Sequence, residues 1–281
     1  DLTETSFVQA EAKYARKHLE DWMRPQRVRT PLMAQPGKSY IQPEPKGVVL
    51  IIAPWNYPMS MVMAPLVGAV AAGNCAIMKP SEITSHTSAA LARILPRYLD
   101  NEAFAVVEGG IPETTELLEQ PFDHILYTGN ERVARVVMAA AAKHLTPVTL
   151  ELGGKSPCLI DKSADIEVAA SRIAWGKFIN AGQTCVAPDH VLVHREVATK
   201  FIETLSAKIR EFYGDDPAQS PDYCRIASER HTERFVKLLE GQKIHTGGRV
   251  DVARRYVEPT IVLDPAPDSA LMQEEIFGPV L

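Results

Sequence analysis

The most restrictive feature of the sequence is an unbroken apolar run at residues 47–53, GVVLIIA. A strand with one face in water alternates polar and apolar residues, whereas a strand of a parallel sheet is covered on both faces and stays apolar. Parallel strands need crossover connections, which are usually helices that cover the sheet. The run therefore predicts an α/β protein in which strands and helices alternate along the chain.

Strand-like and helix-like segments do alternate after this run. Expected strands lie at 75–78, 103–107, 124–127 and 148–150, with expected helices at 59–72, 85–97, 112–119 and 131–142. Five strands joined by helices through short links are typical of a doubly wound sheet. Such a sheet binds its ligands beyond the carboxyl ends of its strands.

The segments on either side complete the expected organisation. Apolar residues spaced by three and four positions from Val8 to Trp22 predict an amphipathic helix, and the proline-rich stretch 31–45 predicts an extended arm. A second block predicts strands at 157–160, 190–193, 242–246 and 257–263 and helices at 166–178, 197–213 and 229–239. We expect two domains, 1–152 with the helix, the arm and a dinucleotide-binding sheet, and 153–281 with a second α/β core.

Composition excludes several classes of protein. Lys and Arg total 30 against 35 for Asp and Glu, a net charge of −5 that argues against binding nucleic acid. The four cysteines form no C-x-x-C pair, which favours a reducing, cytoplasmic location. The longest apolar run is too short to span a bilayer. His190 and His194 lack a clear third ligand, so we expect no metal site.

Cys185 is the candidate nucleophile. It lies in NAGQTCVAP, where Gly182 and Pro188 predict a loop that leaves the preceding helix, and a thiol on a loop can approach a substrate. Most free cysteines are instead small buried side chains. We assign that ordinary role to Cys75, Cys158 and Cys224.

Two polar side chains at strand ends complete a candidate reaction site. Glu151 follows an apolar strand, where partial desolvation would raise its pKa toward the range of a general base. A salt-bridged strand end is an equally good interpretation of Glu151. Asn56 lies between two prolines after the first buried strand, and its amide can donate to an oxyanion. A turn-forming asparagine is the alternative for Asn56.

A third group of residues is suited to a dinucleotide. Lys79 and Glu82 end the second strand, and a carboxylate at this place commonly binds the adenosine ribose. Gly129 ends a later strand and Asn130 opens a helix whose N-terminal amides would face a pyrophosphate. The usual G-x-G-x-x-G fingerprint does not occur. Lys79 and Glu82 also fit a solvated strand end.

Taken together, these segments resemble the NAD(P)-dependent aldehyde dehydrogenases. Within that family the sequence looks most similar to the class 3 and fatty aldehyde dehydrogenase branch. The resemblance runs from about residue 40 to the last residue, and it rests on six motifs in order: PWNYP at 54–58, KPSE at 79–82, YTGN at 127–130, ELGGKSP at 151–157, GQTC at 182–185 and EEIFGPV at 274–280.

The resemblance implies a Rossmann-type cofactor domain, an α/β catalytic domain and a role for each matching residue. Cys185 would be the nucleophile, Glu151 the base, and Asn56 the oxyanion donor together with the Cys185 amide. The expected cofactor is NAD, with NADP possible although Glu82 disfavours a 2′-phosphate. The remaining expected contacts are Lys79, Glu82, Gly129, Asn130, Glu275 and Phe277 to the cofactor and Tyr57 to the aldehyde.

The sequence departs from this family in three places. Glu131 follows Asn130 and would repel a pyrophosphate, with Arg132 as the expected compensating charge, and Ala134 replaces a glycine. Relatives have more chain at both ends, so we expect a truncated chain with part of the second domain missing, and no membrane anchor is visible. The arm at 31–45 pairs with a late strand in relatives, so we expect it to be unpaired here.

The sequence therefore predicts oxidation of medium-chain, long-chain or aromatic aldehydes to acids, in a protein that forms a homodimer at full length. A fragment or binding protein that keeps the fold without turnover is the alternative. A thioester-forming acyl-reductase relative is another interpretation. Glu151 argues against it, because a glutamate there favours hydrolysis of the thioester. A semialdehyde-specific member stays open, because no residue is seen to contact the far end of a substrate.

Overall fold

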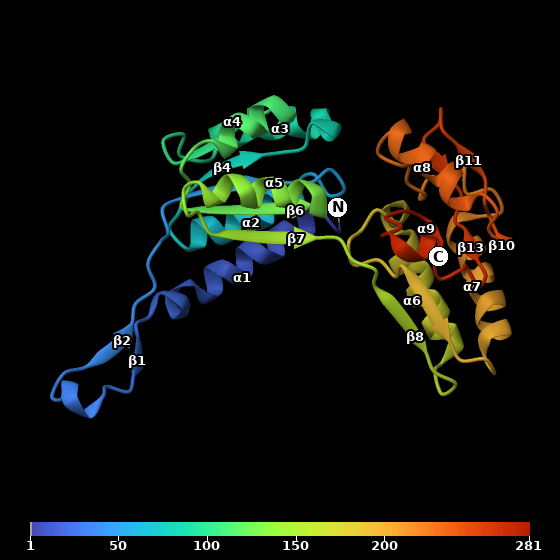
Figure 1. Ribbon diagram of the computed structural model, residues 1–281, viewed down its shortest axis with the longest axis horizontal. Helices are drawn as coiled ribbons and strands as arrows, with labels where there is room; N and C mark the ends of the chain where they lie inside the picture. Colours follow the sequence, from blue (N-terminus) through green and yellow to red (C-terminus); the bar gives the residue numbers. More distant parts are fainter. Residues whose placement is uncertain (1) are drawn as a thin grey trace. The chain divides into compact units, whose positions relative to one another are not determined.

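The computed structural model describes residues 2–281 (Figure 1). The chain divides into two units, Asp1–Leu152 and Gly153–Leu281. The first contains a five-stranded sheet, and the second contains smaller sheets and helices around two clusters of buried residues.

The sheet of the first unit is entirely parallel. Its strands are β3 (Val48–Ile52), β4 (Cys75–Lys79), β5 (Phe104–Val106), β6 (His124–Gly129) and β7 (Val148–Leu152). Their order is β5-β4-β3-β6-β7, with parallel pairing at every step. The chain reverses its direction of winding between β3 and β6, which confirms the doubly wound sheet and places a ligand-binding crevice of the usual kind there.

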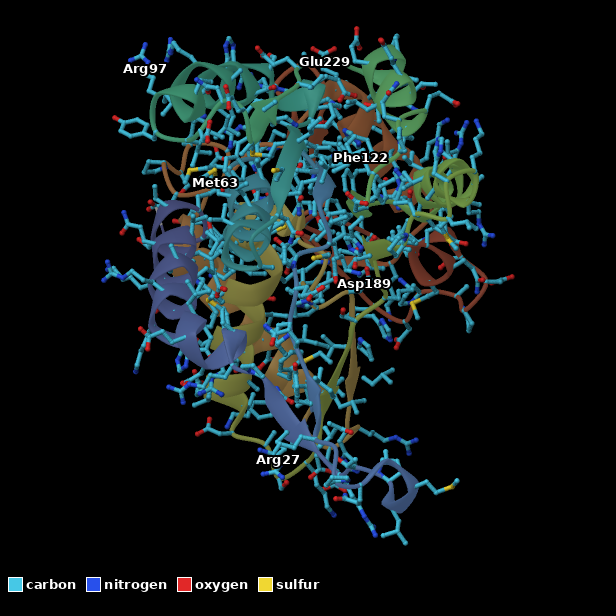
Figure 2. The ribbon with its side chains drawn as sticks, turned by 90° about the vertical axis from the view of Figure 1, so that its left-hand side faces the viewer. Arg27, Met63, Arg97, Phe122, Asp189 and Glu229 are labelled. Atoms are coloured by element: carbon cyan, nitrogen blue, oxygen red, sulfur yellow. The ribbon has the colours of Figure 1, made fainter. Side chains whose placement is uncertain are left out.

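Alternate residues of β3 enter two different cores, which explains why the run is apolar throughout. Leu50 and Ile52 pack with helices α4 (Ile111–Leu118) and α5 (Glu131–Ala142). Val49 and Ile51 pack on the opposite face. The helices on that face are α2 (Ser60–Ala71) and α3 (Ser85–Ile94). Met63 and Phe122 mark these two faces in Figure 2.

Helix α1 (Thr5–Met23) packs against α2. Val8 and Ala15 of the predicted apolar face are buried, but Trp22 is 46% exposed and its ring stacks on His18 at a centroid distance of 6.2 Å. The spacing therefore identified the helix but overestimated its buried face.

The arm folds back on itself. Strands β1 (Gln26–Val28) and β2 (Ser39–Ile41) pair in antiparallel fashion around the short helix η1 (Leu32–Ala34). The expectation of an unpaired arm was wrong, because β1 supplies the backbone partners that β2 needs. The hairpin extends away from the sheet of its own unit (Figure 1).

The second unit combines helices with short strands. Strands β8 (Pro157–Ile160) and β9 (His190–Val193) are parallel, and β10 (Ile244–Thr246) pairs with β13 (Ile261–Val262) and β11 (Val250–Asp251) with β12 (Tyr256–Val257). The helices are α6 (Ile166–Phe178), α7 (Ala198–Tyr213), α8 (Glu229–Leu239) and α9 (Ala270–Gln273). The expected single strand 257–263 is two strands, interrupted around Pro259, which has no amide hydrogen for a ladder.

We expect Leu50→Ala to destabilise the first unit strongly. Leu50 is fully buried at the centre of the sheet, and truncating such a side chain costs about 2–5 kcal/mol of unfolding free energy. Val48→Ala is the matched control, since Val48 is on the same strand but 38% exposed. Urea unfolding measures both variants, and equal midpoints would contradict this assignment of the core.

Candidate active site

The predicted residues of the first unit gather at one edge of its sheet. Lys79 is the last residue of β4, Gly129 is the last of β6, and Glu151 is the penultimate residue of β7. Asn56 and Tyr57 follow β3 within a few residues. Because the strands are parallel, these side chains all lie at the carboxyl edge, where α/β sheets bind ligands.

Lys79 and Glu82 form a polar pair at the end of β4. Lys79 is buried, and its Nζ donates to the carbonyl oxygens of Pro80 at 2.6 Å and Gly109 at 2.7 Å. Burial lowers the pKa of Lys79, and the Glu82 carboxylate, with Oε2 3.7 Å from Nζ, opposes that shift. The Glu82 side chain is half exposed and can accept from a hydroxyl group of a ligand.

The junction between β6 and α5 offers an anion-binding helix end. Asn130 caps α5, and its Oδ1 accepts the Val133 amide at 3.0 Å. The first amides of a helix have no partner within the helix and carry its positive end. A methyl group on Gly129 would lie 2.3 Å from the Tyr127 hydroxyl, so a side chain at Gly129 would require the Tyr127 ring to move.

Glu131 has a different partner from the expected one. Its carboxylate pairs with Arg135, one turn further along α5, and not with Arg132. Residues four apart lie on the same side of a helix, whereas neighbouring residues do not. Ala134 is buried in the core of this face, so its methyl group is accommodated by packing.

Glu151 is exposed, which corrects the expected desolvation. The residue lies on β7, which is an edge strand of the sheet, and its Cα pairs with Thr128 of β6. An edge strand lacks a neighbour on one side, so its side chains are less covered than those of β3. Its assignment as the base stays a prediction.

The segment before Cys185 has an unusual backbone. After α6, residues Asn180, Ala181 and Gly182 all have positive φ angles, of 50°, 51° and 73°. A methyl group on Gly182 would lie 2.2 Å from the carbonyl oxygen of Gly278. A residue other than glycine in the left-handed conformation raises the free energy of the folded chain, so this conformation persists only where surrounding contacts fix it.

Gln183 provides those contacts. This buried side chain donates to the carbonyl oxygens of Asn180 at 2.9 Å and Arg225 at 3.2 Å, and accepts the Ala227 amide at 2.9 Å. Cys185 follows in a turn closed by the Ala187 amide and the Thr184 carbonyl oxygen at 3.0 Å. Gln183 is a structural residue of the site that its motif did not by itself reveal.

The Cys185 side chain is exposed in this turn, as a nucleophile requires. Cys75 and Cys158 are half-buried, and burial raises the pKa of the Cys158 thiol. Cys224 is exposed, so the expectation that it is a buried side chain was wrong. Burial of part of its thiol nevertheless raises the pKa of Cys224, which disfavours the reactive thiolate.

A partly buried ion pair joins three segments of the chain that contain sequence motifs. Lys155 pairs with Asp189, whose other oxygen accepts the Ile276 amide at 2.9 Å. The Lys155 ammonium also donates to the carbonyl oxygens of Leu271 and Glu274. Asp189 (labelled in Figure 2) is the last residue of the segment 180–189 that carries Cys185, which we call the thiol segment. The ion pair therefore connects the thiol segment to residues 153–157 and 274–280. Neither residue was predicted, because their partners are distant in sequence.

Glu275 and Phe277 lie in the third of these segments. The Glu275 carboxylate packs over Gly153, where an added methyl group would overlap it, and accepts the Gly154 amide. Burial raises the pKa of Glu275. Phe277 has a φ of 47°, and the ring of Phe235 packs directly on Gly278 after it.

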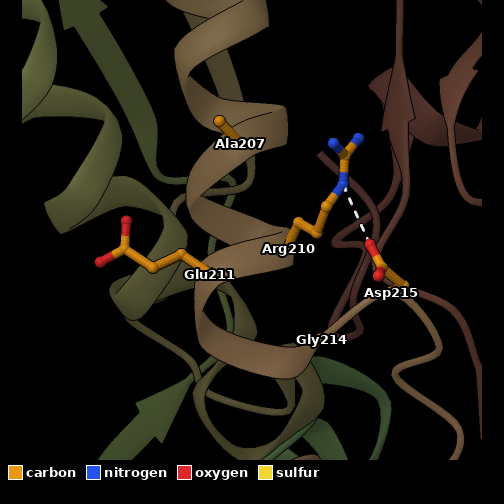
Figure 3. A pocket seen from close by; sticks show the side chains of 5 residues that line it. All are labelled: Ala207, Arg210, Glu211, Gly214 and Asp215. Carbon is orange, nitrogen blue, oxygen red and sulfur yellow. Dashed lines mark ion pairs between the residues drawn. The ribbon is translucent and has the colours of Figure 1, made fainter.

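A surface hollow of the second unit lies away from the predicted site residues. A volume of about 420 Å³ at the end of α7 is lined by Ala207, Arg210, Glu211, Gly214 and Asp215 (Figure 3). Arg210 Nε lies 3.7 Å from Asp215 Oδ1, and both side chains are largely exposed. This open hollow contains no nucleophile. None of the predicted site residues lines it.

Two classes of feature are not found among residues 2–281. No group of three His, Cys, Asp or Glu side chains is arranged to hold a metal ion. In the same part of the chain, no helix is long and apolar enough to cross a membrane.

A parallel doubly wound sheet in the first unit and an exposed thiol on a constrained segment of the second unit define an α/β protein. Residues 3–281 match the model of the aldehyde dehydrogenase family. The chain belongs to the aldehyde dehydrogenase family.

The individual relatives are longer proteins. The chain is 57% identical over 250 residues to aldehyde dehydrogenase family 3 member A2 of Mus musculus, covering 89% of this chain and 52% of that protein. It is 52% identical over 278 residues to the dimeric NADP-preferring aldehyde dehydrogenase of Canis lupus familiaris, covering 99% and 61%. The chain thus spans little more than half the length of these relatives.

Solved structures show the same fold. The substrate-bound AldH of Staphylococcus aureus matches with a TM-score of 0.95 and 49% identity, covering 100% of this chain and 62% of that one. An aldehyde dehydrogenase of Mycobacterium tuberculosis, solved with NAD+, matches with a TM-score of 0.83 and 28% identity, covering 96% and 58%.

We expect Asp189→Asn to destabilise the second unit by about 3–5 kcal/mol, because it leaves the partly buried Lys155 ammonium without its carboxylate. Asp215→Asn is the control, since its carboxylate is 94% exposed and 3.7 Å from Arg210. Urea unfolding of both variants tests this. A loss in Asp189→Asn no larger than in the control would show that the ion pair does not hold the segments.

Proposed function

We propose that the protein oxidises aldehydes to carboxylic acids with NAD(P)+, through a covalent bond to Cys185. The observation that carries this proposal is the exposed Cys185 thiol at the end of a segment fixed by Gln183 and Gly182. A nucleophile held in one conformation approaches a bound carbonyl group with little further loss of entropy. Membership of the aldehyde dehydrogenase family supports the reaction class.

The residues at the carboxyl edge of the first unit fit a dinucleotide. The Glu82 carboxylate can accept hydrogen bonds from ribose hydroxyl groups. The Lys79 ammonium is fixed beside that carboxylate. The capped end of α5, with no side chain at Gly129, suits a pyrophosphate. The pairing of Glu131 with Arg135 reduces its repulsion of that anion.

The second unit would hold the nicotinamide end. Glu275 offers a carboxylate to the second ribose, and Phe277 an aromatic ring beside the nicotinamide. When bound, the cofactor accepts a hydride, which is chemistry that no side chain of the protein supplies.

The proposed reaction proceeds in two stages. The Cys185 thiolate adds to the aldehyde carbon and forms a thiohemiacetal, whose oxyanion accepts hydrogen bonds from the Asn56 amide and the Cys185 backbone. Loss of hydride from that carbon leaves a thioester on Cys185. Glu151 then takes a proton from water, which attacks the thioester, releasing the carboxylic acid and the thiol.

We infer that the substrates are medium-chain, long-chain or aromatic aldehydes, and that Tyr57 contacts the hydrocarbon part of the aldehyde. The resemblance of the PWNYP and NAGQTC motifs to the fatty aldehyde branch supports this class. Both cofactors are compatible with the proposal: the carboxylate of Glu82 favours NAD, whereas a relative is named NADP-preferring.

We expect Cys185→Ser to reduce formation of NAD(P)H from hexanal, decanal and benzaldehyde by about three orders of magnitude or more. A serine hydroxyl is a far weaker nucleophile than a thiolate. Cys158→Ser is the control, because that thiol is half-buried and its pKa is raised. The absorbance of the reduced nicotinamide reports the rate.

Two outcomes would contradict the proposal. Equal rates in Cys185→Ser and in the wild type would exclude thiol catalysis. Binding of NAD(P)+ without turnover of any aldehyde would favour the alternative of a binding protein that keeps the fold.

We also propose that the protein forms a homodimer through the β1–β2 hairpin. Leu32 and Met33 at its tip are 88% and 101% exposed, and Tyr40 and Ile41 on β2 are also exposed. Exposed apolar side chains on a protruding element commonly mark an association surface. The name of the canine relative describes a dimeric protein, which supports this reading.

Replacing both tip residues, Leu32→Asp with Met33→Asp, is expected to convert the dimer to a monomer, because two charges would be buried at the interface. Leu145→Asp is the control, since Leu145 is 91% exposed on a loop of the same unit. Sedimentation velocity measures the mass of each. A dimer that persists in the double variant would place the interface elsewhere.

A further inference from the structure

Helix α8 contributes an arginine to the motif at residues 274–280. Arg234 lies in the middle of α8, and its Nη1 donates to the carbonyl oxygen of Ile276 at 2.6 Å. Its Nη2 donates to the carbonyl oxygen of Glu275, also at 2.6 Å, and to the Glu274 carboxylate at 3.2 Å. One guanidinium group therefore binds three consecutive residues of the motif.

The peptide group between Glu275 and Ile276 has both of its polar atoms bound by charged side chains. Arg234 donates to its carbonyl oxygen, and Asp189 accepts its amide hydrogen at an N–O distance of 2.9 Å. A hydrogen bond with one ionised partner is about twice as strong as a bond between neutral groups. The peptide cannot rotate without losing such a bond, so the direction in which the Glu275 side chain leaves the backbone is set.

The backbone on both sides of Phe277 is held by two neighbouring residues of α8. Before it, Arg234 binds the carbonyl oxygen of Ile276, and Phe277 itself has a φ angle of 47°. After it, the ring of Phe235 packs so closely on Gly278 that an added methyl group would overlap the ring. A left-handed phenylalanine persists only where surrounding contacts fix it, and α8 supplies these contacts.

Helix α8 has anchors of its own that do not involve Arg234. Phe235, Leu238 and Leu239 bury its apolar face in a core cluster. Ser228 caps its first turn and accepts a backbone amide there at 3.3 Å. Replacing Arg234 therefore removes a contact with the neighbouring segment while the packing of the helix remains.

The ion pair with Glu274 does not account for the contacts of Arg234. The Glu274 side chain is 62% exposed, and an exposed pair of this kind contributes little to stability. A lysine ammonium would serve such a pair equally well. Two carbonyl oxygens on successive residues instead match the two terminal nitrogens of a planar guanidinium group, which a lysine lacks.

We propose that Arg234 is a positioning residue, which fixes the backbone at Glu275 and Ile276 and thereby orients Glu275 and Phe277 for the nicotinamide half of a dinucleotide. The consequence for the cofactor rests on the proposed function, in which these two side chains contact the second ribose and the nicotinamide. The fixing of the backbone does not depend on that function.

Arg234→Lys tests the proposal, because it keeps a positive charge near Glu274 and removes the two-nitrogen fork. Arg230→Lys is the matched control, since Arg230 is exposed and lies one turn earlier on the same helix. We expect the Ile276 amide to exchange with deuterium about tenfold faster in Arg234→Lys and at the wild-type rate in the control, as for loss of one hydrogen bond to a charged group.

Two results of the exchange experiment would overturn the proposal. An unchanged rate at Ile276 would show that Arg234 does not fix this backbone. Loss of protection throughout α6 and α7 would show that Arg234 holds the whole second unit and not one segment.

Calorimetric titration with NAD+ and with AMP separates positioning from a general structural role. AMP contains the adenosine ribose that Lys79 and Glu82 are proposed to bind, but it lacks the nicotinamide half. We expect Arg234→Lys to weaken binding of NAD+ about tenfold and to leave binding of AMP unchanged. Equal weakening of both ligands, or of neither, would overturn the proposed orientation of Glu275 and Phe277.

Failure of the proposed function gives a different result. If the wild type binds neither NAD+ nor NADP+, the proposed function fails for both variants alike. The exchange rate of Ile276 then decides the role of Arg234 alone: a tenfold increase confined to Arg234→Lys supports the fixing of the backbone, and equal rates in Arg234→Lys and Arg230→Lys contradict it.

Discussion

The ion pair between Lys155 and Asp189 is the interaction on which the second unit depends. It joins Lys155, which follows Gly153 and Gly154, to the end of the thiol segment. Asp189 also accepts the Ile276 amide and so holds residues 274–280. Because Asp189 is nearly completely buried, its carboxylate has no water to replace a lost partner. Three motifs that are far apart in the sequence are therefore fixed to one another by one charged pair.

The backbone conformation of the residues before Cys185 also makes the site rigid. The left-handed residues before Cys185 are held by hydrogen bonds of the Gln183 side chain, and the carbonyl oxygen of Gly278 leaves no room for a side chain at Gly182. Strain of this kind is tolerated where surrounding contacts over-determine a conformation, and functional loops commonly show it. The exposed thiol thus lies on a segment that has little freedom to move.

Much of the first unit could be predicted from the sequence because its signals are local. The apolar run at 47–53 and the alternation after it follow from covering both faces of a parallel sheet, and the carboxyl-edge residues follow from the strand ends. The β1–β2 hairpin could not be predicted in this way. Its strands have only three residues each and exposed side chains, so no periodicity marks them.

The network around the thiol was also hidden, for a different reason. Asp189 contacts Lys155 and Ile276, which are 34 and 87 residues away, and no local pattern encodes such pairs. Glu151 was expected to be desolvated from its apolar neighbours, but an edge strand leaves it exposed. Sequence motifs therefore identified the residue types of the site, whereas burial and charge pairing required the structure.

The most direct test of the account is to trap the intermediate. The protein would be mixed with decanal and NAD+, quenched in acid within the first turnover and digested for mass spectrometry. The account predicts a decanoyl group on the peptide that contains Cys185, and only when NAD+ is present. An acyl group on a different cysteine, or none on Cys185 while decanoic acid still accumulates, would contradict it.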